Sequence, residues 1–265
     1  MSLDRISESA LKRLVALQQK KRRREEGRFL VEGRRLVEEA LGSPHRVEEL
    51  VVEEGRETEF EAVLERARAA GVRLASAAAP KLARLADTVT PQGVVAVLAA
   101  REWTVSDVVG PGRAIAVLDG VSDPGNVGAI LRSVWAFGLG GAILLPGTAE
   151  RANPKTLRSS MGGGLHLPIV EDVSVSGAVQ ALRGASYHLV ASSPRGGEPV
   201  GRAEWPARSA FLIGSEAAGL GAELDRAADR RVSIEQEPGT ESLNAAVAAG
   251  ILFNQHRIRG FRPVG

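Results

Sequence analysis

Three polar stretches in the second half of this 265-residue chain carry the side chains best suited to chemistry. Each follows a short apolar run of the kind that forms a strand. In the first, residues 119–128, Gly, Pro and Asn predict a tight loop, and Asn126 is suited to cap the helix that follows. Arg132 lies six residues further along, among apolar neighbours, which is unusual for a residue that faces only solvent. The alternative is a surface arginine whose aliphatic stem packs over those neighbours.

The second and third stretches add a carboxylate, a hydroxyl and an amide. Residues 214–221 hold Glu216 between glycines, which let a backbone approach a ligand closely, but their spacing fits neither a Walker A loop nor a dinucleotide fingerprint. A strand-to-helix turn capped by Glu216 is the alternative. In residues 235–244, Ser242 suits a helix N-cap. Asn244 is harder to explain, because alanine would be the better helix former in the alanine-rich run that follows.

The composition removes several classes of mechanism. The chain has no cysteine, which excludes disulfides, thiolate zinc sites and cysteine nucleophiles. Its four histidines are scattered without the spacing of metal ligands, so no metal site is expected. No apolar run approaches the roughly 18 residues that cross a bilayer, and the N-terminal segment lacks the apolar core of a secretion signal. We therefore expect a soluble, cytoplasmic protein with no membrane association.

The elements that must position these residues fall into two series. Residues 1–100 predict a compact α/β unit, with strands at 29–33, 47–52, 72–75 and 93–99 and helices at 7–19, 34–41, 57–70 and 80–85. Residues 101–112 break this pattern and end in Gly-Pro-Gly, which is typical of a linker.

Residues 113–265 predict a second α/β unit. Its strands are expected at 114–118, 141–145, 188–191, 210–213 and 231–234, and its helices at 127–137, 154–160, 175–182, 221–226 and 243–257. Continuously apolar strands that alternate with helices predict a mostly parallel sheet covered on both faces. In such a sheet, ligands bind at the carboxyl edge of the strands, which is where the three polar stretches lie.

Positive charge is concentrated near the N-terminus, although the net charge of the whole chain is only +2. Residues 1–40 contain eleven lysines and arginines against seven acidic residues. A cluster of this kind is typical of phosphate contacts in a nucleic-acid-binding protein, and a solvated helix end is the alternative. The candidate RNA-binding residues are Lys20, Lys21, Arg22, Arg23, Arg24 and Arg28.

Together, the three stretches resemble the motifs of the SpoU/TrmH branch of the SPOUT RNA methyltransferases, in order and spacing, over about residues 114–259. The motif positions are Asn126 and Arg132, then Gly214, Glu216 and Gly219, then Ile234, Ser242, Leu243 and Asn244. Residues 153–162 resemble the segment between the first two motifs. The N-terminal part, with its basic run and the Phe-Leu-Val-Glu-Gly of residues 29–33, resembles the ribosomal-protein-like RNA-binding domain of rRNA-directed members. The third motif departs from the family: Ile-Glu-Gln stands where Ile-Pro-Met is common, and Ala-Ala replaces Val-Ser after the Ser-Leu-Asn core.

The resemblance implies a fold, a cofactor and a reaction. The fold would be a parallel α/β sheet with helices on both faces, a deep trefoil knot, and a small N-terminal α/β RNA-binding domain. Members are homodimers with the active site near the subunit interface, and the apolar face of residues 243–258 is a candidate contact. The methyl donor S-adenosyl-L-methionine would be bound by Gly214, Gly219, Leu220, Ile234 and Leu243.

The implied reaction is methylation of a ribose 2′-hydroxyl in structured RNA, and the favoured substrate is 23S rRNA. Arg132 would stabilise the developing alkoxide as a fixed cation. Asn126, Ser242 and Asn244 would orient the ribose, and Glu216 would hold the loop or Arg132 in place. The alternatives are a tRNA 2′-O-methyltransferase, a non-catalytic RNA-binding protein of the same fold, and a nucleotide-dependent oxidoreductase, which the missing dinucleotide fingerprint disfavours.

Overall fold

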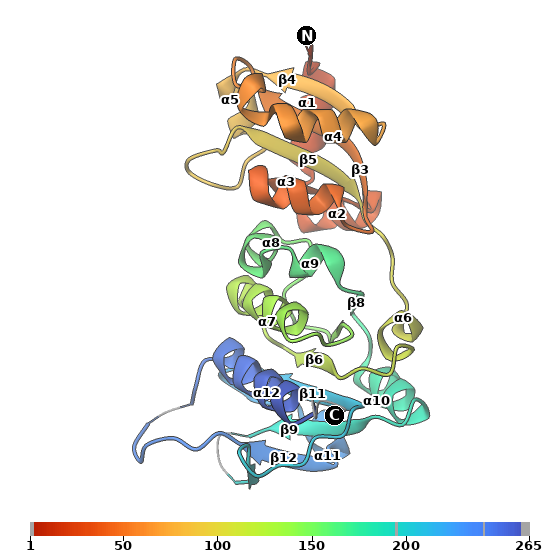
Figure 1. Ribbon diagram of the computed structural model, residues 1–265, viewed down its shortest axis with the longest axis vertical. Coiled ribbons are helices and arrows are strands. Elements are labelled where there is room, and N and C mark those ends of the chain that lie inside the picture. Colours follow the sequence, from red (N-terminus) through yellow and green to blue (C-terminus); the bar gives the residue numbers. More distant parts are fainter. Residues whose placement is uncertain (1–2, 194–195, 241, 261–265) are drawn as a thin grey trace, which may run out of the picture. The chain divides into compact units, whose positions relative to one another are not determined.

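The computed structural model describes residues 3–193, 196–240 and 242–260. The chain divides into two compact units (Figure 1). The first consists of Met1–Arg101 with Ala152–Arg158, and the second of Glu102–Arg151 with Ser159–Gly265.

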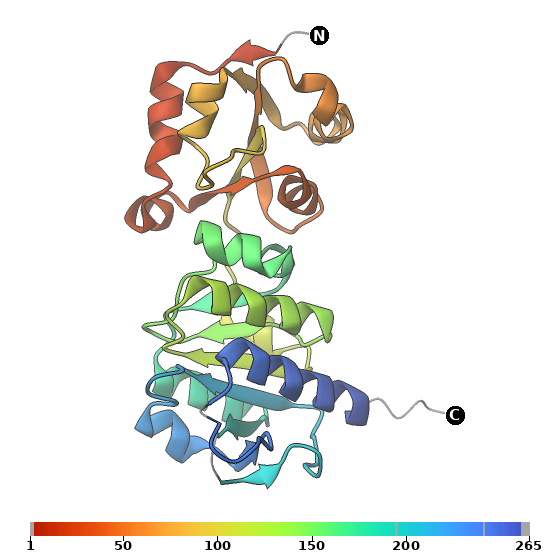
Figure 2. The same ribbon diagram turned by 90° about the vertical axis from the view of Figure 1, so that its left-hand side faces the viewer.

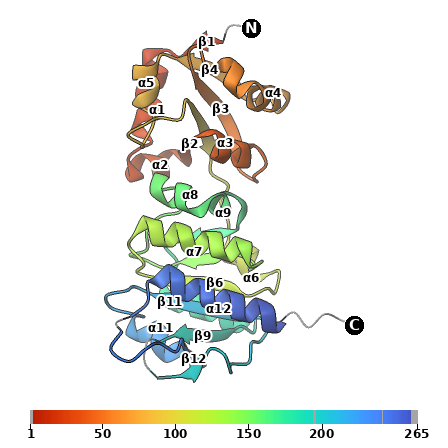
Figure 3. The same cartoon turned by 60° about the vertical axis from the view of Figure 1, so that its left-hand side comes forward.

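The first unit is built on a five-stranded mixed sheet of order β1-β4-β3-β5-β2. Strand β5 runs antiparallel to β2 and β3, whereas β1, β4 and β3 are parallel. Figure 3 shows α1 and α5 on one face of this sheet and α3 and α4 on the other. The strands are β1 (Asp4–Arg5), β2 (Arg28–Glu32), β3 (Arg46–Glu53), β4 (Arg73–Ala77) and β5 (Val94–Ala99); the helices are α1 (Glu8–Ala16), α2 (Lys20–Glu26), α3 (Arg34–Leu41), the 3₁₀ turn η1 (Glu57–Phe60), α4 (Glu61–Ala69) and α5 (Ala79–Ala83).

Most elements of this unit match the prediction, and the differences have local causes. The basic run, which the sequence assigned to no element, forms α2, and Gly27 ends that helix in the left-handed region with φ of 59°. The helix predicted at 57–70 is divided into η1 and α4 at Phe60, whose side chain is buried. Strand β1 is only two residues long, too short for an alternating pattern to reveal it.

The second unit contains a seven-stranded sheet of order β10-β12-β9-β11-β6-β7-β8, in which every neighbouring pair is parallel. All five predicted strands are present. The structure adds two short ones, β8 and β10, at the sheet edges. The strands are β6 (Ile115–Asp119), β7 (Ala142–Leu144), β8 (Ile169–Glu171), β9 (His188–Ser192), β10 (Glu198–Pro199), β11 (Ser209–Gly214) and β12 (Arg230–Ser233).

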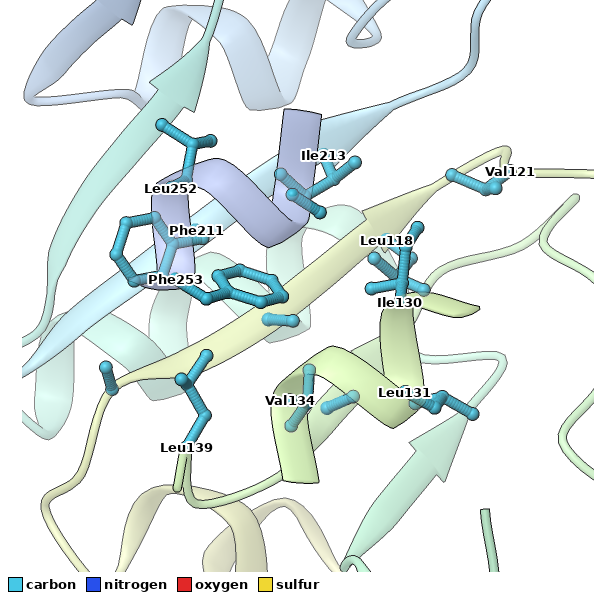
Figure 4. Packing of buried hydrophobic residues seen from close by; sticks show 14 of the residues in the cluster. Leu118, Val121, Ile130, Leu131, Val134, Leu139, Phe211, Ile213, Leu252 and Phe253 are labelled. Atoms are coloured by element: carbon cyan, nitrogen blue, oxygen red, sulfur yellow. The ribbon is translucent and has the colours of Figure 1, made fainter. Parts of the chain in front are cut away.

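Helices cover both faces of this parallel sheet, as the sequence predicts. On one face, α12 lies beside α7 (Figure 2). Figure 4 shows Ile130 and Val134 of α7 and Phe253 of α12 in a shared core over the central strands. On the other face, α6, α10 and α11 enclose a second core around Val117 and Leu212. From residue 102 onward, the helices are α6 (Val105–Val109), α7 (Pro124–Ala136), α8 (Pro154–Ser160), α9 (Gly163–His166), α10 (Val175–Gly184), α11 (Ala222–Ala227) and α12 (Ala245–Gly260).

The stretch predicted as a linker, residues 101–112, is partly folded. Thr104 and Asp107 form a capping box that begins α6, and Val108 of this helix is fully buried in the second unit. Among the described residues, no helix is both long enough and apolar enough to span a membrane. The trefoil knot implied by the resemblance stays a prediction.

Candidate active site

Three loops converge because their strands are parallel and leave the same edge of the sheet. Strands β6 and β11 are hydrogen-bonded neighbours, and β12 is on the far side of β9. The loop after each strand carries one of the three predicted motifs. The structure brings Asn126, Glu216 and Asn244, one side chain from each motif, within hydrogen-bond distance of one another.

One carboxylate oxygen is the centre of this cluster. Glu216 Oε1 accepts hydrogen bonds from Asn126 Nδ2 at 3.0 Å, from Asn244 Nδ2 at 2.6 Å and from the backbone N–H of Ala245 at 3.1 Å. Asn244 Nδ2 also lies 3.0 Å from Asn126 Oδ1. Ala245 is the first residue of α12, so the negative charge of Glu216 lies at a helix N-terminus, where the helix dipole stabilises it. Three segments distant in sequence are therefore tied together through one side chain.

The helix caps differ from the prediction. Helix α7 begins at Pro124, and Asp123 caps it by accepting a hydrogen bond from the Asn126 backbone N–H at 2.9 Å. Asn126 is therefore inside the first turn, where its side chain is left to bind Glu216. At α12, Asn244 Oδ1 accepts from the N–H groups of Ala246 and Val247, so Asn244 is the cap in place of Ser242. This capping role accounts for an asparagine at the start of an alanine-rich helix.

The glycines of the second motif are required by a loop that folds back on itself. Ser215 and Gly219 exchange two backbone hydrogen bonds of 3.1 and 2.9 Å, and Gly219 has a positive φ of 67°. A Cβ atom on Gly214 would lie 2.2 Å from the carbonyl carbon of Gly219, which leaves no room for a side chain. Gly214 is therefore needed for the close packing of the loop against the end of β11, in addition to its position in the second motif.

Asp119 holds the far end of this loop and was missed by the sequence reasoning. Its Oδ2 accepts a hydrogen bond of 2.7 Å from the Gly221 N–H, at the start of α11. The predicted alternative, in which Glu216 caps this helix, is therefore wrong. A carboxylate directly after an apolar strand was the available signal, because it lies at the ligand-binding edge of the sheet.

A cleft of about 980 Å³ opens between the second and third loops. Four of the five predicted donor-binding residues line it: Gly214, Gly219, Ile234 and Leu243. The fifth, Leu220, packs instead against the core beneath α10 and α11. Glu216 and Ser242 also line the cleft.

The chemistry of the lining fits S-adenosylmethionine. The lining includes glycines and apolar side chains such as Ile213 and Leu243. The ionisable groups among the described lining residues are carboxylates: Glu216, Glu235 and Glu237. A negative cleft attracts a sulfonium cation and repels a cofactor rich in phosphate. Gln236 Oε1 is in addition buried without a hydrogen-bond partner among the described residues, so the lining offers an acceptor to a bound ligand.

Arg132 lies outside this hydrogen-bonded cluster. It is on α7, six residues after Asn126, which corresponds to about 9 Å along a helix axis. Its side chain is exposed, and within the described residues no hydrogen bond or ion pair engages it. Glu216 therefore holds the loops together and does not hold Arg132. The guanidinium is left available to a ligand.

Family models match both parts of the chain. One described as the SpoU rRNA Methylase family matches residues 113–254, which is more than half of the chain. Another, described as an MRM3-like substrate binding domain, matches residues 8–96. The chain belongs to the SpoU rRNA methylase family.

Relatives extend this match to nearly the whole chain. The chain is 33% identical over 244 residues to the 23S rRNA (guanosine(2553)-2′-O)-methyltransferase RlmP of Bacillus subtilis, covering 92% of this chain and 93% of that protein. An AdoMet-bound rRNA methyltransferase from Sinorhizobium meliloti has a TM-score of 0.85, at 29% identity over 98% of both chains. A structure concerned with 2-OH methylation of C/U34 on tRNA has a TM-score of 0.51, at 26% identity over 57% of this chain and 97% of that one.

Within the SpoU family, the departure of this chain after the Ser-Leu-Asn core has little consequence for the cluster. Ala245 and Ala246 use their backbone N–H groups, which bind Glu216 and Asn244, so their side chains need not be those of the family pattern.

The candidate RNA-binding residues of the first unit do not form one uniform patch. Arg23 is only 7% exposed, and its guanidinium donates to the carbonyls of Leu17 and Gln18 at 2.9 and 2.7 Å, which is a structural role. Arg28 is paired with Glu48 at 2.7 Å. The remaining predicted residues are exposed on α2: Lys20, Lys21, Arg22 and Arg24.

Proposed function

We propose that this SpoU family member transfers a methyl group from S-adenosylmethionine to a ribose 2′-hydroxyl of 23S rRNA in the cytoplasm. Two of the proteins that align over nearly the whole chain, those from Bacillus subtilis and Sinorhizobium meliloti, are named as rRNA methyltransferases, whereas the tRNA-related structure matches little more than half of it. The observation that carries the proposal is the cluster of Asn126, Glu216 and Asn244, which joins all three motifs at the edge of a negatively charged cleft.

The residues of the cleft would hold the methyl donor. Gly214, Ile234 and Leu243 contribute backbone and apolar surface, and the carboxylates favour a cationic ligand. When bound, S-adenosylmethionine supplies an electrophilic methyl group. Ser242 lines the cleft, where its hydroxyl can orient the ribose, while Asn126 and Asn244 fix the loops through Glu216.

The chemical difficulty is the ribose hydroxyl, which is a poor nucleophile because its pKa is very high. Arg132 is the residue proposed to overcome it. A guanidinium remains protonated at all physiological pH values, so it does not act as a base. As a preorganised cation it stabilises negative charge on the attacking oxygen and can bind the neighbouring phosphate. Its exposure and lack of a partner within the described residues support this role.

The first unit would bind RNA, and the second would dimerise. We assign RNA binding to residues 1–100, through the exposed cations of α2, and methyl transfer to residues 113–265. On α12, Val247 and Ile258 are 51% and 63% exposed, and eleven residues apart they lie on one side of the helix. This stripe supports a homodimer formed through α12.

The test is methylation of in-vitro-transcribed 23S rRNA by the purified protein, with tRNA transcripts as the comparison. Positions of 2′-O-methylation are mapped in the product and in rRNA from cells with and without the gene. We expect S-adenosylmethionine to suffice in excess EDTA, with spermidine present to fold the RNA. Methylation of tRNA alone would overturn the substrate assignment, and RNA binding without affinity for the donor would show a non-catalytic protein.

A further inference from the structure

Gln236 is a residue of the cleft whose polar side chain has no evident role in holding the surrounding loops together. It follows Ile234 and Glu235 in the third motif. Its Oε1 atom is buried, and the described residues provide no hydrogen bond to it. The same residue lines the cleft.

An unpartnered buried amide oxygen is costly, because the group has lost its hydrogen bonds to water and gained none from the protein. Methionine is close to glutamine in length and has no such acceptor, so it would fill the same space without that cost. Keeping an amide here is therefore unfavourable for the ligand-free fold. The unfavourable contribution is removed when a bound ligand places a donor against Oε1.

We propose that the side chain of Gln236 accepts a hydrogen bond from S-adenosylmethionine. Gln236 is then a specificity residue for the methyl donor in this chain, beside the backbone groups of the loops. This inference rests on the proposed function. The cofactor carries two kinds of donor that could reach an acceptor in the cleft: the amino and hydroxyl groups of its adenosine, and the ammonium of its methionine part. Either donor satisfies the carbonyl and leaves the Gln236 amide nitrogen free to bind water or backbone.

The proposal predicts opposite changes in two quantities. Replacing glutamine by an apolar residue of similar length, Gln236→Met, should raise the melting temperature of the ligand-free protein or leave it unchanged, because the unsatisfied group is gone. The same change should weaken S-adenosylmethionine binding about tenfold, because the hydrogen bond to the ligand is lost. A residue with only a structural role would behave differently, since its replacement lowers the melting temperature and affects binding only through loss of fold.

The experiment is isothermal titration calorimetry with the full-length protein, combined with thermal unfolding. The ligands are S-adenosylmethionine, S-adenosylhomocysteine and 5′-methylthioadenosine, which lacks the ammonium group. A tenfold loss for all three places the bond at the adenosine end, and a loss for only the first two places it at the ammonium. Gln236→Leu repeats the test in case the methionine variant packs poorly.

Gln255→Met is the matched control, because Gln255 lies on α12, is half-buried and does not line the cleft. Its affinity for the donor should equal that of the unchanged protein. Unchanged affinity in both Gln236 variants would overturn the inference while leaving the proposed function intact. Absence of donor binding by the unchanged protein would instead contradict the proposed function itself.

Discussion

The charged residues of the candidate site in the second unit have different partners from those on the surface of the first unit. In the first unit, charges are mostly paired with their opposites at the surface, as in Arg56 with Glu59 at 2.8 Å and Arg84 with Glu8 at 3.0 Å. The Arg56 guanidinium holds the pKa of Glu59 below its usual value, and Arg84 does the same to the pKa of Glu8. In the second unit, Glu216 is bonded to amides and a helix N-terminus, and Arg132 has no ionic partner among the described residues.

This difference separates surface electrostatics from chemistry. Exposed ion pairs contribute little to stability, and their partners can be exchanged for phosphates at small cost. A carboxylate that accepts three hydrogen bonds at the junction of three loops instead fixes their geometry. The first unit is therefore suited to additive, salt-dependent binding, and the second to a reaction in which position matters.

The largest effect is expected from Arg132. Arg132→Ala should lower the rate of methyl transfer by about 10²–10³, because one electrostatic contact to the transition state is removed. Since Arg132 is exposed, the melting temperature and donor affinity should stay nearly unchanged. Arg132→Lys should also be poor, because a point charge cannot reproduce a planar fork that binds hydroxyl and phosphate together.

Single-turnover methylation at saturating RNA measures this effect. A transition-state contact lowers kcat and kcat/KM equally, whereas a contact made only with the bound RNA raises KM. A near-normal rate at saturation would return Arg132 to the alternative of a surface arginine.

A smaller effect is expected from Glu216, whose carboxylate holds the three loops together. Glu216→Ala leaves Asn126, Asn244 and the Ala245 N–H without their shared acceptor. A displacement of about 1 Å in such a loop can cost up to about 10² in rate. We expect a tenfold or greater loss in both donor affinity and turnover, and partial recovery in Glu216→Gln, which keeps an acceptor oxygen.

Glu223→Ala is the control, because Glu223 is an exposed carboxylate in the first turn of α11, outside the cleft. Calorimetry with S-adenosylmethionine distinguishes the two variants. Equal behaviour of both would show that the cluster is not needed to hold the cleft open.

The sequence predicted the parallel sheet and its polar edge well, because apolar strands and intervening helices are local patterns. It also placed Asn126, Glu216 and Asn244 in one site, through the order and spacing of the motifs. It could not predict which residues cap the N-termini of α7 and α12. The choice between Ser242 and Asn244, or between Asp123 and Asn126, depends on which side chain the folded loop turns toward the helix, and both candidates have suitable chemistry.

The sequence also did not predict which residues pair across long stretches of the chain. Asp119 binds the Gly221 N–H across 102 residues of sequence, and Leu220 turns toward a core on the other face of the sheet. In the basic run, Arg23 is distinguished from its neighbours only by which side of α2 faces the protein. Sequence reasoning on charge therefore grouped residues whose surroundings differ.

The smallest effect in this comparison is expected from the exposed cations of α2. Lys20, Lys21 and Arg22 are all exposed, and their pairing with Glu25, where it exists, is at the surface. Changing all three to glutamate should weaken rRNA binding without changing donor affinity. The slope of log binding constant against log salt concentration should become shallower by about 2–3. The reason is that up to three phosphate contacts are lost, and with them the counterions that they release.

Arg23→Ala turns the same run of charge into a test of the contrast between its buried and its exposed cations. Because Arg23 is buried and bonds two carbonyls, its loss should lower the stability by on the order of 2 kcal/mol. RNA affinity and its salt slope should change little while the protein stays folded, since this guanidinium does not face solvent. The two variants are therefore distinguished by two measurements. The triple glutamate variant changes RNA binding, which is measured by salt titration, and Arg23→Ala changes stability, which is measured by thermal unfolding. If the triple variant bound rRNA with an unchanged slope, these three side chains would be the solvated face of a helix, and the phosphate contacts would come from other exposed cations, such as Arg24 in the first unit and Arg132 in the second.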